Sequence, residues 1–190
     1  MQTAPEPAPE NTPNEKKEKK EKTVGSEILS WVVSLAVALA AAMLIRTFLF
    51  TLITVDGTSM MDTLLDGDKL YVSVLSAKIQ GYEHGDVVIC HYPGRNDFCV
   101  KRVIALPGDT VMVEHGQVYV NGEALEEDYI VYPAAYSYPE TTMGEGEYFL
   151  LGDNRHISHD SHSPDVGPVT RVVGKARAII WPPNRIGAVK

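Results

Sequence analysis

A stretch without any charged side chain, residues 28–45, constrains the fold of this chain more than any other feature of the sequence. It reads ILSWVVSLAVALAAAMLI, and apolar residues resume after Arg46. A helix built from it would be apolar on every side, which is typical of a helix in lipid rather than on a protein surface. The stretch also reaches the lower length limit for crossing the hydrocarbon core of a bilayer. We therefore predict one transmembrane helix over residues 27–48.

Two other interpretations of this stretch stay open. A fully buried helix of a soluble protein could be equally apolar. A cleaved secretory signal peptide is the second alternative, since Ala38-Leu39-Ala40 has the small-x-small form of a cleavage site. Such a leader would be unusually long, and cleavage there would divide the apolar stretch in its middle. The transmembrane helix is therefore the interpretation that we favour.

The residues before the stretch are polar and rich in lysine. Residues 1–26 offer too little apolar surface to offset the entropy of ordering, so we expect a disordered tail. Its lysines stand at positions 16, 17, 19, 20 and 22, and positive charge beside a membrane span marks the cytoplasmic side. We expect a single-pass protein of the cell membrane, with the lipid bilayer as a partner, the tail in the cytoplasm and residues 49–190 outside.

The charge of the exported part argues against one class of partner. Residues 51–190 contain eleven Lys and Arg against nineteen Asp and Glu, which accounts for the whole net charge of −8. A nucleic-acid-binding surface would require an excess of positive charge. We therefore expect no nucleic acid as a partner, and the length of this part suits one domain.

Short β-branched segments separated by Gly, Pro, Asn and Asp dominate the exported part, a pattern typical of strands. His115-Gly116 separates two such segments and predicts a tight hairpin. We expect a mainly β domain, either a barrel or a pair of packed sheets, with a surface excursion over residues 126–146. The expected strands are residues 49–55, 69–74, 86–91, 99–106, 110–114, 117–120, 147–151 and 174–180.

Ser59 and Lys101 are candidates for a nucleophile and its base. A serine hydroxyl attacks poorly until a base takes its proton, and a lysine serves as that base only when its amine is neutral. Lys101 lies in the apolar segment CVKRVIAL beside Arg102, and alternation along a strand places the two on opposite faces, so one must face inward. Burial would lower the pKa of an inward lysine. The alternative is that Lys101 extends along a sheet edge with its amine in water.

A third polar segment, GDNRHISHDSH at residues 152–162, follows an apolar run. Its hydroxyls, carboxylates and imidazoles could supply hydrogen bonds that orient a catalytic amine. The alternative is a metal site built from His156, His159, His162 and Asp160. We favour the first interpretation and expect neither a metal nor another cofactor, because the surrounding residues are poor helix formers and would not hold the histidines on one helical face.

Three sequence blocks in this order resemble the type I signal peptidases, membrane-bound serine proteases that remove signal peptides from exported proteins. GTSMMDTL at residues 57–64 is similar to the family pattern G-x-S-M-x-P-T-L. KRVIALPGD at residues 101–109 matches K-R-V-x-x-x-P-G-D, and GDNRHISHDSH is similar to G-D-N-R-x-x-S-x-D-S-R. The resemblance covers nearly all of residues 27–182.

The resemblance implies that Ser59 is the nucleophile, that Lys101 is the general base and that the Ser158 hydroxyl orients the lysine amine. It also implies that the main-chain N–H of Ser59 donates to the oxyanion, as acyl transfer requires. The expected function is cleavage of signal peptides of translocated preproteins through an acyl-enzyme on Ser59.

Further roles are implied for charged residues around this pair. Asp153 would be the ionic partner of Arg102, and Asp160 would support the site from below. The arginine that closes the family pattern is His162 here. Asp160 would then depend for its countercharge on Arg155 or on an imidazole that titrates near neutral pH.

Two other positions also depart from the family pattern. Asp62 replaces a proline and loses its fixed φ, although an Asp side chain can shape a turn. Gly57 has no hydroxyl, so the side-chain oxyanion donor of some members is absent. The substrate is implied to be an extended segment with small residues at the first and third positions before the cut. It would be added as a strand against the strand before Lys101 and the edge near Thr54, Val55, Asp56 and Gly57.

Two rival functions remain. A self-cleaving Ser/Lys protease like the SOS repressors would need a DNA-binding domain in place of residues 1–50. A catalytically inert or specialised signal-peptidase-like protein acting in surface-protein assembly would be expected to have lost Ser59 or Lys101. Both residues are present in this chain.

Cys90 and Cys99 end one expected strand and begin the next. Facing residues of an antiparallel hairpin can lie close enough for a disulfide, and an oxidising compartment would allow one. We expect a bridge, and two reduced thiols beside a mobile loop are the alternative.

Overall fold

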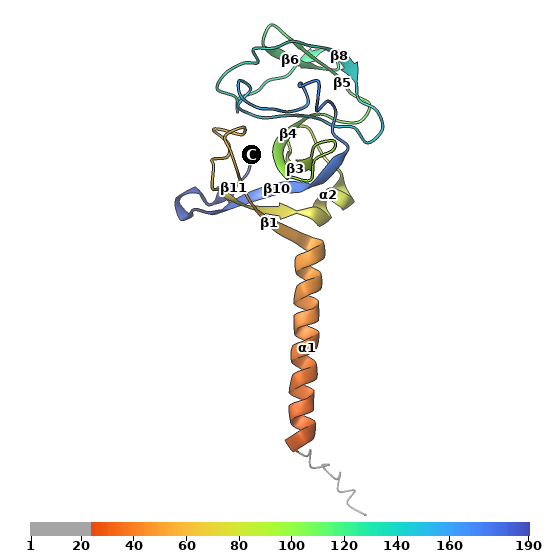
Figure 1. Ribbon diagram of the computed structural model, residues 1–190, viewed down its shortest axis with the longest axis vertical. Helices are drawn as coiled ribbons and strands as arrows, with labels where there is room; N and C mark the ends of the chain where they lie inside the picture. The colour runs from red at the N-terminus through yellow and green to blue at the C-terminus, as the bar shows by residue number, and fades with distance from the viewer. Residues whose placement is uncertain (1–23) are drawn as a thin grey trace, which may run out of the picture. The chain divides into compact units, whose positions relative to one another are not determined.

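The computed structural model describes residues 24–190, without the side chains of residues 24, 26 and 44–50. Most of the tail predicted for residues 1–26 therefore lies outside the described residues. Two compact units divide the chain between Ala40 and Ala41. The unit that follows this division contains all of the strands (Figure 1).

Helix α1 spans Val24–Leu49 (Figure 1). Its described apolar side chains are exposed, with Trp31 at 77% and Leu29 at 64%. No helix in the described part of the chain is both long and apolar enough to cross a membrane. The transmembrane helix predicted over residues 27–48 is therefore not confirmed.

The larger sheet is antiparallel throughout and carries the strands on which the site is built. Its order is β1-β2-β10-β3-β4-β9, with β11 paired to β10. Helix α2 (Val74–Gln80) follows β2 directly, because the Ser73 hydroxyl accepts from the Ser76 N–H at 3.3 Å and caps the helix. A short 3-10 helix, η1 (Pro183–Arg185), precedes β11. The strands are β1 (Phe50–Thr54), β2 (Lys69–Ser73), β3 (Val87–His91), β4 (Cys99–Ala105), β9 (Phe149–Leu151), β10 (Arg171–Trp181) and β11 (Gly187–Ala188).

The smaller sheet has the order β7-β6-β5-β8. Its strands are β5 (Thr110–Glu114), β6 (Gln117–Val120), β7 (Glu123–Ala124) and β8 (Tyr138–Thr142). His115 and Gly116 join β5 to β6 with φ values of 50° and 83°, so the predicted hairpin turn has the left-handed backbone that its glycine favours.

Apolar side chains from both sheets share a core. Ile104 of β4 and Phe149 and Leu151 of β9 are buried together with Val111 and Val113 of β5. This cluster joins the smaller sheet to the β4–β9 end of the larger one. The expectation of a mainly β domain is confirmed, and its form is two antiparallel sheets rather than a closed barrel, because the larger sheet ends openly at β1 and β9.

The excursion predicted for residues 126–146 is not confined to the surface. It contains β8, which pairs with β5, and its Ala134 and Met143 are buried. The turn-forming residues around Tyr138 concealed this strand from a sequence pattern. Glu127, at the start of the segment, has a side chain that is only 4% exposed.

Candidate active site

Ser59 lies in the turn that follows β1. Met60 and Leu64 anchor this turn in the core, and the Leu64 N–H donates to the Met60 carbonyl oxygen at 2.8 Å. The Asn154 N–H donates to the Ser59 carbonyl oxygen at 3.0 Å. Residues 152–162, called the 152–162 loop below, therefore hold the turn from the other side.

Gly57 begins the same turn with a φ of 93°, and its N–H donates to Asp66 Oδ1 at 2.8 Å. A residue with a side chain would be strained in this left-handed conformation. The glycine at this position therefore suits the backbone that the turn adopts.

Lys101 reaches the serine from β4. Its Nζ donates to Ser59 Oγ at 2.7 Å, and the residue is only 4% exposed. Desolvation lowers the pKa of Lys101, and the nearby Asp160 carboxylate opposes this shift more than any other charge. The amine is thus brought closer to the neutral form in which it could accept the serine proton.

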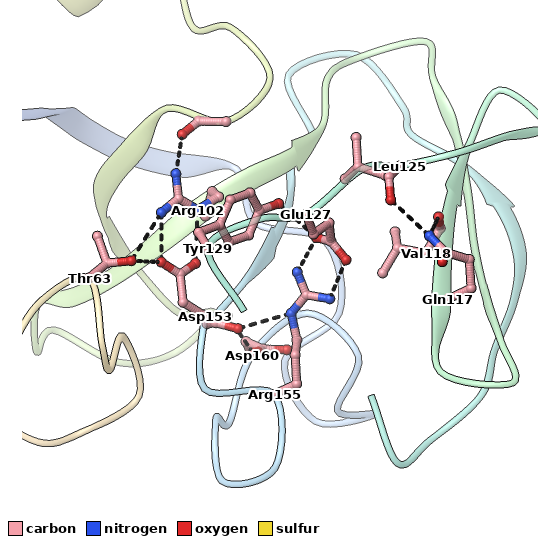
Figure 2. Close-up of polar contacts among 12 residues, drawn as sticks. Thr63, Arg102, Gln117, Val118, Leu125, Glu127, Tyr129, Asp153, Arg155 and Asp160 are labelled. Carbon is pink, nitrogen blue, oxygen red and sulfur yellow. Dashed lines mark hydrogen bonds and ion pairs between the residues drawn. The ribbon is translucent and has the colours of Figure 1, made fainter. Parts of the chain in front are cut away.

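Arg102 points to the opposite face of β4 and is also buried, at 2% exposure. Its Nε and Nη2 donate to Oδ1 and Oδ2 of Asp153 at 2.8 and 2.6 Å (Figure 2). Thr63 Oγ1 donates to Asp153 Oδ2 at 2.5 Å. Strand alternation required only one inward side chain of the Lys101–Arg102 pair, and the structure buries both because Asp153 offers the second one a partner.

Asp160 contacts several polar groups of the 152–162 loop. Its Oδ2 accepts from the Ser158 hydroxyl at 2.5 Å and from the Gly152 N–H at 2.8 Å. Its Oδ1 lies 2.6 Å from His162 Nδ1. Ser158 thus donates its hydroxyl proton to Asp160, and its expected role in orienting the lysine amine stays a prediction.

His162, and not Arg155, is the partner of Asp160. The imidazole also stacks on the Tyr136 ring, with centroids 3.7 Å apart and planes 10° from parallel. Arg155 pairs with Glu127 instead. Of the two candidates that the His162 departure left open, the imidazole is the one in contact with Asp160, and its role as a countercharge stays a prediction.

A cleft of about 610 Å³ opens beside Ser59 and Lys101. The four residues expected to bind substrate, Thr54, Val55, Asp56 and Gly57, all line it. The cleft is also lined by Cys99 and Val100 of β4, together with Tyr92, Phe98, Ile157 and His159. The three sequence blocks therefore meet at one cavity.

A model of the family described as "Signal peptidase, peptidase S26" matches residues 28–181. The chain belongs to this signal peptidase family.

Relatives with assigned names agree with this membership. Probable signal peptidase I-2 of Synechocystis sp. is 38% identical over 149 residues, which are 75% of this chain and 68% of that protein. Signal peptidase I of Leptolyngbya laminosa is 36% identical over 75% of this chain and 74% of its own length. Signal peptidase I of Bacillus amyloliquefaciens is 33% identical over 78% of this chain and 85% of its own length. The chain is a signal peptidase enzyme.

The histidines of this signal peptidase have separate partners. His162 contacts Asp160, His159 Nε2 lies 3.1 Å from Asp165 Oδ2, and the His156 ring meets the Tyr132 ring edge to face. Within residues 24–190 no group of three or more His, Cys, Asp or Glu is placed to hold a metal ion. The three histidines that suggested a metal site therefore each contact a different side chain.

Cys90 and Cys99 of the signal peptidase face each other in the register of β3 and β4. Both are free thiols, so the expected bridge is not formed in this structure although the expected pairing of the two positions is present. Burial raises the pKa of the Cys90 thiol to about 12 and also raises that of Cys99, which disfavours the reactive thiolate.

Glu127 and Tyr129 were missed by the sequence analysis. Both contact arginines of the motif blocks, Glu127 through Arg155 and Tyr129 through its ring, which lies 3.9 Å from Arg102 Cζ (Figure 2). A charged residue in a segment rich in turn formers gives no sign of burial, so no sequence pattern could have found Glu127.

Proposed function

We propose that this signal peptidase hydrolyses the signal peptides of translocated preproteins through an acyl-enzyme on Ser59, with Lys101 as the general base. The observation that carries the proposal is the 2.7 Å contact between Lys101 Nζ and Ser59 Oγ at a lysine that is 4% exposed. A hydroxyl beside a desolvated amine meets both conditions for activating a serine nucleophile.

The reaction takes two steps. Neutral Lys101 accepts the Ser59 hydroxyl proton while Oγ attacks the scissile carbonyl carbon, and the Ser59 N–H donates to the oxyanion. The resulting ammonium gives its proton to the leaving amine as the peptide C–N bond breaks. A water molecule then attacks the ester, Lys101 takes a proton from it, and Ser59 recovers its hydroxyl proton as the acyl group leaves.

The 152–162 loop sets the balance of charge at the lysine. Asp160 favours the ammonium that forms during the reaction, and desolvation favours the neutral amine that begins it. Ser158 donates to Asp160 and so limits the effect of this carboxylate on the lysine. Both forms of the amine remain accessible because neither influence acts alone.

The substrate fits as an extended strand between two open edges. In the described chain β1 pairs only with β2, so its other edge is unpaired. Residues 51–57, which include most of β1, line the cleft. On β4, the register with β9 begins at Arg102, so residues 99–101 pair only with β3 among the strands that the structure describes. Main-chain hydrogen bonds along such edges give affinity, and alternate side chains give specificity. We place the small substrate residues before the cut at the β1 edge, near Val55.

Membrane association is a further part of the proposal. The exposed apolar side chains of α1, such as Leu29 and Trp31, are unsuited to water over such a length. The cytoplasmic position of the tail stays a prediction from its lysines. Protease added to intact cells stripped of their wall should digest residues 49–190 and spare the tail, and the reverse pattern would overturn this orientation.

The experiment that tests the activity uses the full chain in detergent with a preprotein that carries a signal peptide. We expect one cut behind small residues, identified by mass spectrometry of the products, and no cut by Ser59→Ala. Binding of the preprotein without cleavage by the parent chain would instead support the inert, assembly-related alternative.

A further inference from the structure

Residues 127–136, called the platform below, contact the 152–162 loop. Three of their side chains meet residues of the motif blocks: Glu127 binds Arg155, Tyr129 lies under Arg102, and Tyr136 stacks on His162. Figure 2 shows Glu127 and Tyr129 between the two arginines. None of these three platform side chains lines the cleft.

Glu127 makes the most completely buried of these contacts. Its Oε2 accepts from Arg155 Nη1 at 2.9 Å, and its Oε1 accepts from Arg155 Nη2. The Tyr129 hydroxyl donates to the same Oε1 at 2.7 Å. The Arg155 side chain is 0% exposed, so its planar guanidinium is fixed by two parallel hydrogen bonds away from solvent.

Arg155 transmits this restraint to the backbone of the loop. Its Nε donates to the Gly152 carbonyl oxygen at 3.1 Å, and the Gly152 N–H donates to Asp160 Oδ2 at 2.8 Å. A Cβ on Gly152 would lie 2.1 Å from Ser158 Oγ and 2.5 Å from the Ser59 carbonyl oxygen. Both main-chain polar groups of Gly152 are therefore hydrogen-bonded. The residue also packs against the turn of Ser59 and the hydroxyl bound to Asp160.

We propose that Glu127 is a positioning residue for proteolysis. Through Arg155 it fixes the backbone of Gly152, and with it the placement of the 152–162 loop against the Ser59–Lys101 pair. The inference rests on the proposed function, because it concerns the geometry of the same pair. Glu127 itself touches neither the substrate nor the reacting atoms.

A merely structural role would not need this arrangement. A buried ion pair contributes little to stability compared with apolar side chains of similar volume, whereas loss of one partner leaves a buried charge uncompensated. What the pair supplies beyond apolar packing is a fixed direction for Arg155 Nε. The expected effect of losing it is therefore on kcat, with KM little changed, since neither partner lines the cleft.

The test compares the full chain with Glu127→Gln and with the double variant Glu127→Met/Arg155→Met in detergent, using the same preprotein. The double variant removes both charges, so no charge is left uncompensated. The Gly152 carbonyl and the Tyr129 hydroxyl lose a partner each, so thermal unfolding should occur a few degrees below the parent temperature, with the fold retained. We expect its kcat to fall by about 10- to 100-fold, with KM within about twofold of the parent, as a small misplacement of catalytic groups predicts. Glu127→Gln should lower kcat in the same direction.

Lys175→Met is the matched control. Lys175 is also buried, and its Nζ lies 2.6 Å from Asp86 Oδ2 in an ion pair that does not involve the 152–162 loop. It should lower the unfolding temperature and leave kcat unchanged. A folded double variant with the parent kcat would overturn the inference, and if the double variant does not fold, a folded Glu127→Gln with the parent kcat would do so. A parent chain without cleavage would instead refute the proposed function.

Discussion

Gly152 approaches Ser158 so closely that a Cβ on the glycine would lie 2.1 Å from the serine hydroxyl oxygen. The Ser59 carbonyl oxygen would lie 2.5 Å from the same Cβ. Gly152, which packs against both the nucleophile turn and the hydroxyl bound to Asp160, therefore has no room for a side chain.

We expect Gly152→Ala to separate these two elements. Overpacking of a closely packed site costs about 1–3 kcal/mol, and the shift of the Ser59 turn should lower kcat by about tenfold or more. Thermal unfolding and single-turnover cleavage measure the two effects. Gly187→Ala is the control, because its Cβ would have no neighbour nearer than 4.0 Å. Parent activity in Gly152→Ala would show that the turn tolerates displacement.

Ser59→Ala and Lys101→Met should each abolish cleavage and leave the fold intact. Loss of a nucleophile or of its base costs several orders of magnitude in kcat. Circular dichroism would establish the fold, and quantified product would establish the rate. Activity within about tenfold of the parent in either variant would make the Ser/Lys assignment wrong.

The pH dependence should report the ionisation of Lys101. Because only the neutral amine is a base, kcat/KM should rise with pH through the pKa of Lys101, which desolvation places below the ordinary lysine value of about 10.4. Asp160→Asn removes the charge that favours the ammonium, so the pKa should fall further and the rising limb should move to lower pH.

Asp165→Asn provides the control for this shift, since its side chain is 63% exposed and pairs with His159. It should leave the rising limb where it is in the parent. A limb that stays in place in Asp160→Asn, or moves to higher pH, would contradict the electrostatic role of Asp160.

The two cysteine thiols should differ in how readily a labelling reagent reaches them. Cys90 is fully buried and its pKa is raised to about 12, so native iodoacetamide labelling should reach Cys99 first. Two labels should appear after denaturation without a reductant. An unlabelled protein whose mass is lower by two hydrogens would instead reveal the bridge that the sequence led us to expect.

Most strands could be predicted because short β-branched segments between turn formers mark them directly. The segments 110–114 and 117–120 coincide with β5 and β6. Helix α2 was missed, since its start depends on a cap by Ser73 at the end of an otherwise ordinary strand. Strand β8 was missed because its sequence, YPETT, contains a proline and has little apolar character.

The candidate site, like the strands, could be predicted only in part. Ser59, Lys101, Arg102 and Asp153 lie in motif blocks, and the structure brings them together as two pairs. The partners of Arg155 and Asp160 depend on which distant segment reaches them, and pairing by charge alone could not choose between Glu127 and Asp160 for Arg155. Tertiary contacts of this kind are absent from the local pattern.

One edge of β1 is unpaired within residues 24–190, and this has a consequence for the timing of cleavage. Only a chain whose own main-chain groups are unpaired can hydrogen-bond to such an edge. A helix, or a strand inside a folded sheet, has no such groups to offer. The enzyme would therefore discriminate by conformation as well as by residue size, and a preprotein would be cut while the segment around its cleavage site is still extended.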